Sequence, residues 1–379
     1  MPVRRDIIRL RRELHRDPEI SNNEYDTAEK ISSFFEKTSP DKVVILGKTG
    51  RAFVFSGKEP GRTTVFRAEL DALPISEESS LPHASRRPGR AHACGHDGHM
   101  AILAGLAERV AADRPRRGKT VLLFQPAEEV EQGARDVVEN TRFLAFKPDY
   151  MFALHNIPGY PKHRILIRGG AFSAASRGMT IVLKGRTSHA AEPENGLNPV
   201  HAVERIIHDF TALGSEKDIF QKRVLLTFIH IRLGEIAFGT SPGYAEVRVT
   251  LRTFCNDDME LLASRTSRLV QQIANAEQLK YDISFSEEFP ATDNHTEAVA
   301  MVKQAAADAG CTVDELPEPF RWSEDFAYYA GIAKTAIFGL GSGINQPQLH
   351  NPDFDFPDEI IGTGISVFYS LYKLHHCRP

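Results

Sequence analysis

The sequence predicts an α/β protein in which a smaller α+β domain interrupts a larger one. Two observations carry this prediction. Near-continuous apolar runs such as TVLLFQP and YMFALHN end in polar residues, as buried parallel strands do when they carry functional groups at their carboxyl ends. From Arg177 to about Glu287 the pattern changes to strand, helix, strand, strand, helix, strand, and the first pattern then returns.

The elements before this change follow from periodicity and from turn residues. Ile7, Leu10 and Leu14 recur at helical spacing, so we expect a helix over about residues 5–16 that ends near the turn-like DPE. Gly and Pro turns separate three short expected strands, VVIL, AFVFSG and TTVFRAEL, and the apolar run MAILAGLAERVAA is expected to be a helix.

The later elements define the domain organisation. Those of the interrupting part are, in order, strand MTIVLKG, helix VHAVERIIHDFTAL, strands VLLTFIHIRLG and AEVRVTLRTF, helix MELLASRTSRLVQQIANAEQ and strand YDISFSE. This β-α-β-β-α-β order is typical of a ferredoxin-like α+β domain. Helix HTEAVAMVKQAAADAG, strand KTAIFGLG and a helix after Pro357 resume the larger part. We therefore expect one domain from residues 1–174 and 287–379, and an inserted domain from residues 175–286.

Composition limits the classes of function. With 379 residues the chain has room for about two domains, at roughly 100–200 residues each. Its net charge of −4 comes from interleaved acids and bases, so we expect no nucleic-acid partner. The N-terminus lacks an apolar core of signal-peptide length and no run reaches about 18 apolar residues, so we expect a cytoplasmic protein without a membrane partner. The four cysteines are widely spaced, and reduced thiols are expected.

The segment HACGHDGH, residues 92–99, indicates a metal site because it packs histidines, a cysteine and an aspartate before a helix-like run. Three other segments, FQPAEE, FALHN and PQLHNPDF, supply further coordinating groups. Thiolate, imidazole and carboxylate together favour zinc, manganese, cobalt or nickel over calcium or magnesium. Five candidate ligands exceed the need of one ion, so we expect two divalent ions that share a bridging group and a water. These ligands are Cys94, His96, Glu129, His155 and His350.

The pair Glu128 and Glu129 predicts a division of roles. Adjacent residues at the end of a strand point to opposite sides, so one carboxylate can ligate while its neighbour faces the water. A metal lowers the pKa of its bound water, and an unligated glutamate can take the proton and pass it to a leaving amine. This chemistry predicts amide hydrolysis by a metal-bound hydroxide, without a covalent intermediate.

These motifs resemble those of the dinuclear metallo-aminoacylase and carboxypeptidase family, and in particular its amidohydrolase branch of hippurate hydrolases and auxin-conjugate (IAA-amino acid) hydrolases. Nine segments stand in that branch's order and span most of the chain: RRELHRDPE, RAELDALPISEE, HACGHDGH, FQPAEE, ALHN, TSHAAEP, LRTF, SEDFAYY and LHNPDFDF. The resemblance implies a zinc-peptidase-like catalytic domain with a mixed central sheet and a ferredoxin-like lid. It also implies hydrolysis of N-acyl amino acids or similar conjugates.

The resemblance further implies roles for individual residues. The five ligands named above would hold the metals, and Glu128 would act as general base and acid. His189, in the inserted domain, would stabilise the tetrahedral oxyanion as a hydrogen-bond donor. In relatives the lid commonly carries a dimer contact. The resemblance therefore allows a homodimer through the lid, in which His189 serves its own or a partner's site.

Two departures leave the substrate open. Glu69 stands where relatives usually have Asp, in what we interpret as a position that supports the ligands together with the retained Asp71. FGTSPG, with Gly239 and Thr240, replaces an Asn-containing motif that resembles a substrate-carboxylate contact. The acyl group, the amino acid and the native metal therefore stay undefined, and an amine product without an α-carboxylate is a further hypothesis.

Several residues have two readings. Arg252 is either a salt-bridge residue at a strand edge or the group that binds the substrate's carboxylate. Asp325 either caps a helix or supports a ligand through a hydrogen bond, and we favour support. His92 and His99 are interpreted as structural or supporting groups, and a lone histidine such as His15 or His208 as a surface or helix-end residue.

Rival functions make different predictions. A cysteine hydrolase using Cys94 would leave FQPAEE and LHNPDF unexplained, and a zinc nucleobase deaminase would need a P-C-x-x-C element that the chain lacks. A catalytically silent metal-binding scaffold would be favoured by a missing ligand or by a replaced Glu128, and neither is seen. A carboxypeptidase or dipeptidase acting on small peptides is the alternative within the same family.

Overall fold

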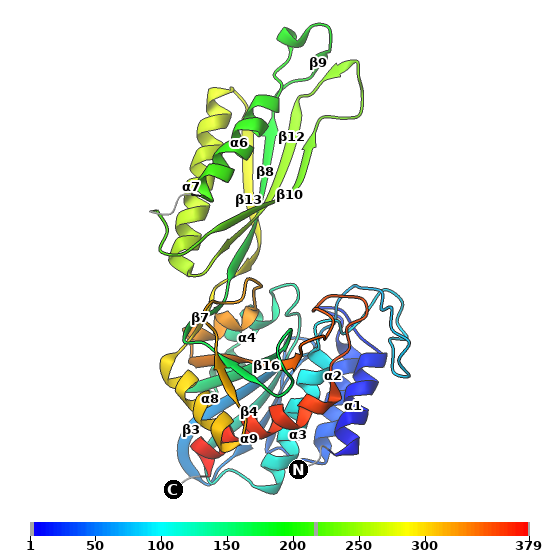
Figure 1. Ribbon diagram of the computed structural model, residues 1–379, viewed down its shortest axis with the longest axis vertical. Helices are drawn as coiled ribbons and strands as arrows, with labels where there is room; N and C mark the ends of the chain where they lie inside the picture. The colour runs from blue at the N-terminus through cyan, green and yellow to red at the C-terminus, as the bar shows by residue number, and fades with distance from the viewer. Residues whose placement is uncertain (1–3, 216–218, 378–379) are drawn as a thin grey trace. The chain divides into compact units, whose positions relative to one another are not determined.

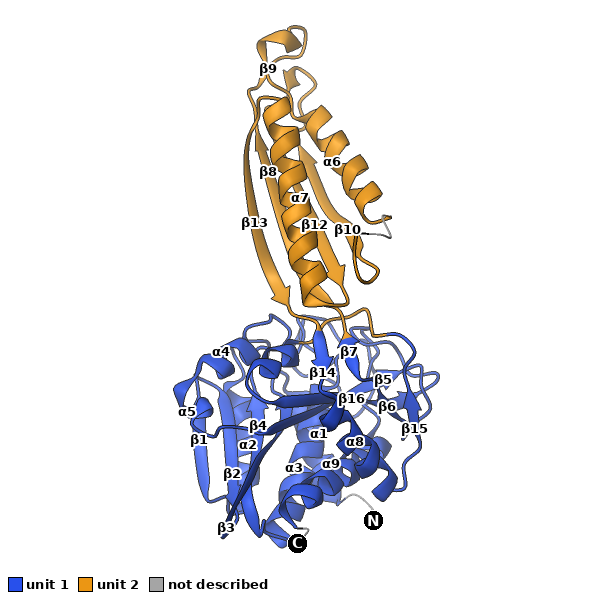
Figure 2. Cartoon of the chain, turned by 90° about the vertical axis from the view of Figure 1, so that its left-hand side faces the viewer, with its two compact units in different colours: residues 1–172, 292–318, 325–379 blue, residues 173–291, 319–324 orange. Residues whose placement is uncertain are grey.

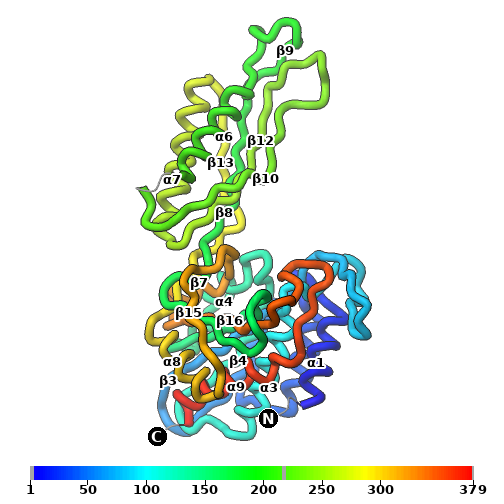
Figure 3. The backbone as a smooth tube through the Cα atoms, viewed as in Figure 1, coloured from blue at the N-terminus to red at the C-terminus, as the bar shows by residue number. Residues whose placement is uncertain are grey.

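The computed structural model describes residues 4–215 and 219–377, and the chain forms two compact units (Figure 1, Figure 2). The first contains the residues up to Phe172, Thr292–Glu318 and the residues from Asp325 onward. The second contains Ser173–Ala291 and the short segment Pro319–Glu324. The colours of Figure 3 follow this path, from blue through cyan to green in the first unit, from green to yellow in the second, and from yellow-orange to red back in the first.

The first unit is built on an eight-stranded sheet of order β1-β2-β4-β3-β5-β16-β6-β15. Four strand pairs are parallel, namely β3 with β4, β3 with β5, β5 with β16, and β6 with β15; the other three are antiparallel. The expected mixed central sheet is therefore confirmed. Its strands are β1 (Lys42–Leu46), β2 (Gly50–Ser56), β3 (Glu59–Glu69), β4 (Arg117–Gln125), β5 (Tyr150–Pro158), β6 (Ile165–Ile167), β15 (Val313–Glu315) and β16 (Lys334–Gly343).

Helices cover this sheet, and the alternation of residues along each strand shows which side chains meet them. Phe66 and Ala68 of β3 join the main apolar core with α1, α2, α3, α8 and α9, whereas Arg67 and Glu69 point to the opposite face because side chains alternate along a strand. That face meets α4 and the 3-10 segment η2 (Asp325–Gly331). The helices are α1 (Arg5–Arg16), α2 (Tyr25–Glu36), α3 (His96–Ala112), α4 (Gly133–Glu139), α5 (Thr141–Leu144), α8 (Thr296–Asp308) and α9 (Ile361–His376).

The second unit is a four-stranded antiparallel sheet of order β10-β12-β8-β13 with two helices. Its own apolar core lies between the sheet and these helices. The chain order is β8 (Ala175–Lys184), α6 (Val200–Leu213), β10 (Leu225–Leu233), β12 (Tyr244–Thr253), α7 (Asn256–Ala276) and β13 (Lys280–Phe289), which confirms the expected β-α-β-β-α-β pattern. A short ladder in the second unit pairs β9 (Ser188–His189) with β11 (Thr240–Ser241). Another short ladder, where the chain passes from the first unit to the second and returns, pairs β7 (Gly170–Ser173) with β14 (Thr292–Asn294).

The boundaries expected from the sequence, 174/175 and 286/287, lie close to the divisions of the two units at 172/173 and 291/292. The assignment of Pro319–Glu324 to the second unit is a feature that the sequence did not predict. Within residues 4–215 and 219–377, no helix has both the length and the apolar character that crossing a membrane requires.

Of the two alternatives expected for His15, a surface or a helix-end residue, the helix-end position is correct, but the side chain is fully buried rather than on the surface. It lies in the last turn of α1, eight residues after Ile7 and therefore on the same face of the helix as the apolar residues. Its Nδ1 donates to Asp97 Oδ2 at 2.9 Å, and its Nε2 lies 3.4 Å from Glu77 Oε2. Burial alone would lower the pKa of His15, but Asp97 and Glu77 raise it to about 9. His208, by contrast, is exposed as expected.

This raised pKa predicts a loss of stability at alkaline pH. The folded-state pKa of His15 lies above its ordinary value of 6.5, so its contribution is complete below pH 6.5 and disappears as the pH rises through about 9. We expect His15→Gln to remove up to about 3 kcal/mol of this pH dependence in the free energy of unfolding. Urea unfolding at several pH values between 6 and 9.5 measures it, with His208→Gln as the control. Parallel profiles for wild type and His15→Gln would contradict the assignment.

Candidate metal centre

The parallel strands of the first unit bring functional side chains to one edge of the sheet. Parallel strands end on the same side, and the register places Glu69 of β3 opposite Gln125 of β4. Glu128 and Glu129 follow the end of β4, and His155 lies near the end of β5. The expected delivery of polar groups by buried parallel strands is what the register shows.

The turn in front of α3 adds a thiol and an imidazole to this edge. Gly95 has φ +91°, a left-handed conformation that costs a non-glycine residue energy, and it separates Cys94 from His96, the first residue of α3. A Cβ atom at this position would lie 2.4 Å from Asn156 Oδ1, so the backbone and the amide approach each other closely. Only glycine satisfies both the torsion angle and this contact.

The donor atoms of the five expected ligands converge in two sets that share Cys94. One set is Cys94, His96 and His155, the other is Cys94, Glu129 and His350, and the ligand atoms within each set lie within 4.8 Å of one another. Cys94 Sγ is 3.5 Å from His155 Nε2, and Glu129 lies 3.7 Å from both His96 Nε2 and His350 Nε2. These overlapping sets bring together enough donors for two cations.

The tautomers of two histidines leave their Nε2 atoms as electron-pair donors. His96 Nδ1 donates to the carbonyl oxygen of Asp71 at 2.8 Å, and His155 Nδ1 donates to that of Asn156 at 2.9 Å. In the neutral ring that a metal ligand requires, each Nε2 would carry its lone pair toward the cluster. His96 Nε2 is buried and has no hydrogen-bond partner in the described part of the chain. The distances between His96 Nε2 and the neighbouring donor atoms suit a set of ligands around one cation, because each ligand atom would lie about 2.0–2.3 Å from that cation.

The electrostatics of the cluster favour a cation. Burial opposes the protonation of His96, but its hydrogen bond with Asp71 and the charges of Glu69 and Glu129 raise its pKa to about 10. Burial raises the pKa of the Cys94 thiol well above its ordinary value, and Glu129 and Glu128 raise it further. A catalytic thiol needs the opposite shift, so this environment argues against the cysteine hydrolase. A divalent cation beside Cys94 would instead favour its thiolate.

Glu128 and Glu129 do not point to opposite sides as expected. Both carboxylates lie within 4 Å of His96 Nε2, at 3.9 Å for Glu128 and 3.7 Å for Glu129. The physical reason is that the strand ends at Gln125, so the two residues occupy a turn rather than a pleated strand. Ala127, directly before them, has φ +51°, a conformation that is uncommon for a residue with a side chain. The proposal that Glu128 is the general base and Glu129 a ligand therefore does not rest on opposite directions of their side chains.

Asp71 holds two of the ligand-bearing segments. It is fully buried, its Oδ2 accepts hydrogen bonds from the Ser21 hydroxyl at 2.7 Å and the Glu129 backbone N–H at 3.0 Å, and its carbonyl orients His96. Burial would raise the pKa of Asp71, but these contacts and His96 lower it overall. The sequence-based interpretation of Asp71 as a supporting residue agrees with these contacts.

A second buried network supports the other side of the cluster. Asp325 Oδ1 accepts from Arg67 Nη2 at 2.6 Å, its Oδ2 accepts from Gln125 Nε2 at 2.7 Å and from the Ala134 backbone at 2.9 Å, and its own backbone N–H points to Glu128 Oε1 at 3.4 Å. Sequence reasoning singled out Asp325 but missed Arg67 and Gln125. The available signal was a polar residue on a strand whose neighbours are apolar.

Glu69 and His99 continue this network. Glu69 accepts from Arg67 and, through Oε2, from His99 Nδ1 at 2.8 Å, while His99 Nε2 lies 2.7 Å from Asn156 Oδ1. Both ring nitrogens of His99 thus have partners, which agrees with its interpretation as a supporting group. His92 is also buried, and burial lowers its pKa to about 3, so it is a neutral residue of the interior.

The second unit holds the two remaining candidates, His189 and Arg252. His189 is exposed on β9, where it pairs with Thr240 of β11. Its Nδ1 accepts a hydrogen bond from the Ala191 backbone at 3.1 Å, so a neutral ring carries its proton on Nε2. Arg252 Nη1 donates to the Arg321 carbonyl and to the Ser323 hydroxyl, both at 2.9 Å, and so fastens the segment Pro319–Glu324 within this unit.

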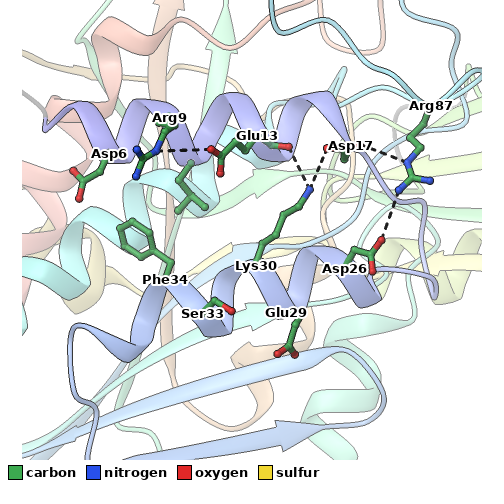
Figure 4. Close-up of a pocket in the computed structure, with 11 residues that line it drawn as sticks. Asp6, Arg9, Glu13, Asp17, Asp26, Glu29, Lys30, Ser33, Phe34 and Arg87 are labelled. Atoms are coloured by element: carbon green, nitrogen blue, oxygen red, sulfur yellow. Dashed lines mark hydrogen bonds and ion pairs between the residues drawn. The ribbon is translucent and has the colours of Figure 1, made fainter.

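A cavity of about 690 Å³ lies away from the ligand cluster, along α1 and α2 (Figure 4). Most of its charged side chains take part in ion pairs. Lys30 and Arg87 both contact Asp17, and Arg9 contacts Glu13. We assign no function to this cavity.

Thiol, imidazole and carboxylate donors gathered at one edge of the sheet define a candidate metal centre, and the comparisons with known proteins place the chain among metal-dependent hydrolases. The family model "Peptidase family M20/M25/M40" matches residues 65–374. The N-acetylcysteine deacetylase of Bacillus subtilis is 30% identical over 372 residues, 96% of this chain and 95% of that protein. The hippurate hydrolase of Campylobacter jejuni is 28% identical over 367 residues, 96% of this chain and 94% of that protein.

A solved structure extends the match to the fold. The YxeP protein of Bacillus subtilis, a dinuclear metal-binding peptidase of the M20 family, superposes with a TM-score of 0.85 at 27% identity, over 97% of both chains. The chain therefore belongs to the peptidase family M20/M25/M40. This membership confirms the resemblance inferred from the sequence motifs.

Gly95 provides a test of how the turn builds the cluster. We expect Gly95→Ala to move Cys94 and His96, because the new Cβ would collide with the Asn156 amide, and to weaken cobalt binding at least about 10-fold. Gly89→Ala is the matched control, since Gly89 has φ +72° with open space around its Cβ position. It should cost about 1–2 kcal/mol of unfolding free energy and leave metal binding intact. Cobalt titration and thermal unfolding measure both effects, and equal cobalt affinity in the two variants would contradict the expectation.

Proposed function

We propose that this protein is a metal-dependent amidohydrolase that cleaves N-acyl amino acids into a carboxylic acid and an amino acid or similar amine. The observation that carries the proposal is the convergence of the donor atoms of five residues with the carboxylate of Glu128 beside them. The names of two relatives, a hippurate hydrolase and an N-acetylcysteine deacetylase, describe reactions of this class.

Two divalent cations suit the chemistry of this donor set. When bound, they supply a Lewis acid for the amide carbonyl and lower the pKa of the attacking water. Zinc, manganese, cobalt and nickel all accept thiolate, imidazole and carboxylate ligands, and metal analysis of the purified protein would identify the native ion. The proposed ligands are Cys94, His96, Glu129, His155 and His350.

Glu128 is the proposed general base and acid. The Asp325 backbone N–H lies near its Oε1, while its Oε2 lies 3.9 Å from His96 Nε2 and therefore at the donor cluster. From this position the carboxylate would take a proton from the attacking water and deliver it to the nitrogen of the leaving amine. Glu129, which lies between His96 and His350, is the proposed ligand of the pair.

His189 is the proposed donor to the oxyanion of the tetrahedral intermediate. Because the Ala191 backbone N–H occupies Nδ1, the Nε2–H of a neutral ring is the group that the side chain presents. A neutral donor directed at developing negative charge contributes about 2.7–4 kcal/mol in other hydrolytic sites. This role requires the second unit to bring His189 to the substrate.

Gly239 bears on the choice of substrate. Its carbonyl accepts the Ala190 backbone N–H at 3.0 Å, which places it beside His189, and the space where a side chain would stand is open. Without a side-chain amide there, recognition of the substrate's carboxylate falls to Arg252 or is absent. Strict dependence of turnover on the free carboxylate would favour Arg252, whereas equal turnover of an N-acyl amino acid and its carboxamide would support an amine product without that group.

Separate substitutions of Glu128 and Glu129 test the mechanism. We expect Glu128→Gln to retain metal and to lower kcat by about 10²–10⁴-fold, because it removes only the proton-transferring group. Glu129→Gln should lose metal and activity together. Metal content and turnover of a panel of N-acyl amino acids and small dipeptides, before and after chelation and with zinc, manganese, cobalt or nickel restored, measure both. Chelator-insensitive turnover would contradict the metal mechanism, and bound metal without any turnover would favour a silent scaffold.

A homodimer through the second unit is also proposed. Within the described residues β10 is an edge strand of its sheet, and exposed apolar side chains lie on it and in the loop that follows: Ile229, Ile231, Leu233, Ile236 and Phe238. An edge strand with exposed apolar side chains is suited to pairing with a second chain. Sedimentation equilibrium of wild type and Ile231→Lys measures the association, and a monomeric wild type would contradict it.

Variants of His189 and Glu128, tested singly and in mixed dimers, would identify the subunit that supplies each group. We expect His189→Ala to keep its metal and to lose about 10²–10³-fold in kcat, with His201→Gln, an exposed change in the same unit, as the control. If His189 serves the partner's site, subunit exchange between inactive His189→Ala and Glu128→Gln proteins should restore activity. No restoration in exchanged dimers would place His189 at the site of its own chain.

A further inference from the structure

A buried arginine near the N-terminus connects the segments that carry two of the proposed metal ligands. Arg11 lies on the buried face of α1 with 1% of its surface exposed. Its Nη1 donates to Asp97 Oδ2 at 3.2 Å and to Asp355 Oδ1, and its Nε donates to Asp358 Oδ1 at 2.9 Å. One guanidinium therefore contacts three carboxylates from two distant parts of the chain.

These carboxylates stand close to ligands in the sequence. Asp97 directly follows His96 in the first turn of α3. Asp355 follows His350 by five residues, in the segment between β16 and α9 that ends at the 3-10 turn η3 (Asp358–Ile360). In Figure 3 this segment, in orange-red, runs beside α1, in blue, as the Arg11 contacts require.

The His350 segment is otherwise an irregular loop. His350 has φ +66°, its side chain is 51% exposed, and its backbone N–H donates to the Ala93 carbonyl at 2.8 Å. A second backbone contact joins Glu78 to Pro352 at 2.8 Å. Phe354 and Phe356 on either side of Asp355 are buried in the apolar core, and the Arg11 contacts, buried at Asp97 and partly buried at Asp355 and Asp358, add charged hydrogen bonds that fix the Asp355 side of the loop.

The Arg11 guanidinium is better suited than a metal ion at the same place to hold these carboxylates in fixed positions. His15, Asp97 and Asp355 could by their spacing form a cation site. The guanidinium already lies among them, because its Nη1 contacts both carboxylates. Its planar fork carries several N–H groups in fixed directions, so it can fix the relative positions of carboxylates from different segments, which a lysine ammonium cannot do in the same way.

We propose that Arg11 is a positioning residue for the metal centre, which sets the distance between the His96 end of α3 and the His350 loop. This inference rests on the proposed function, since it treats His96 and His350 as ligands. Loss of the Arg11 contacts lets the His350 loop move, and the cation that His350 helps to hold is then bound more weakly. Arg11 touches no reacting atom and acts only through the two segments.

The test compares Arg11→Met and Arg11→Lys with Arg12→Met. Arg12 is the matched control, because it pairs with the same Asp358 at 2.7 Å but has a half-exposed side chain. We expect both Arg11 variants to lose at least about 10-fold in affinity for the more weakly held of two cobalt ions, and to show faster hydrogen exchange over residues 344–357. Arg12→Met should change neither by more than about twofold.

Asp355→Asn extends the test, because it removes the loop's side of the contact while leaving Arg11 in the core. It should reproduce the faster exchange and the weaker cobalt binding, and the double variant Arg11→Met with Asp355→Asn should be less impaired than the sum of the single changes. If the Arg11 variants do not fold, Asp355→Asn alone decides the question. Thermal unfolding of each variant without metal separates a general loss of stability from a change confined to the loop.

The outcomes for this inference and for the proposed function are distinct. If wild type binds two cobalt ions and hydrolyses substrate while Asp355→Asn and the Arg11 variants match Arg12→Met, the positioning role is overturned and the proposed function stands. If wild type binds no metal, the proposed function fails and the positioning of a metal centre fails with it. Faster exchange of the His350 loop together with weaker cobalt binding supports the inference, and unchanged exchange overturns it.

Discussion

The structure depends on holding several electron-pair donors close together in a buried place. Thiol, imidazole and carboxylate groups brought within 4.8 Å of one another lose hydration and repel where they are negative. The surrounding chain offsets part of this cost, since the carbonyl oxygens of Asp71 and Asn156 accept the Nδ1–H groups of His96 and His155. The remaining imbalance is seen in the raised pKa values of His96 and Cys94, and a divalent cation would relieve it. The metal centre is thus a property of the whole arrangement of charge, not of any single ligand.

The backbone meets the same constraint with uncommon conformations beside the donors. Gly95, Ala127 and His350 all have positive φ, at +91°, +51° and +66°, and each lies at or next to a proposed catalytic or ligand residue. At Ala127 and His350 such a conformation costs energy and persists where the surroundings hold it, whereas glycine adopts it readily. These conformations turn the chain sharply at the ends of β4 and at the start of α3, so that side chains from separate strands face one point. The regular sheet sets the approximate position of the donor side chains, and these turns set their final position.

This division explains what the sequence could predict. Strands and helices with strong periodicity were predicted closely, as for α1 and α6, because apolar spacing reports directly which face is buried. The five candidate ligands were chosen from residue types and motif order, and the structure brings their donor atoms close together, while their role as ligands stays a prediction. The direction of Glu128 and Glu129 was predicted wrongly because it depends on where β4 ends, and the burial of His15 was missed because a histidine on an apolar face has no partner until the fold supplies Asp97. Arg67 and Gln125 were missed for the same reason, since their partner Asp325 lies about 200 residues or more away in the chain.

One chain of contacts shows why Glu69 belongs to the site although it is not among the proposed ligands. From Asp325, next to Glu128, the contacts run through Arg67 to Glu69, from Glu69 to His99, from His99 to the Asn156 amide, and the Asn156 carbonyl orients His155. The network therefore reaches the proposed base at one end and a proposed ligand at the other. Glu69 spans the middle with one carboxylate oxygen on Arg67 and the other on His99. Because a shorter aspartate would have to reach the same two partners from a backbone fixed in β3, the extra methylene of Glu69 is matched to the positions of Arg67 and His99 in this protein.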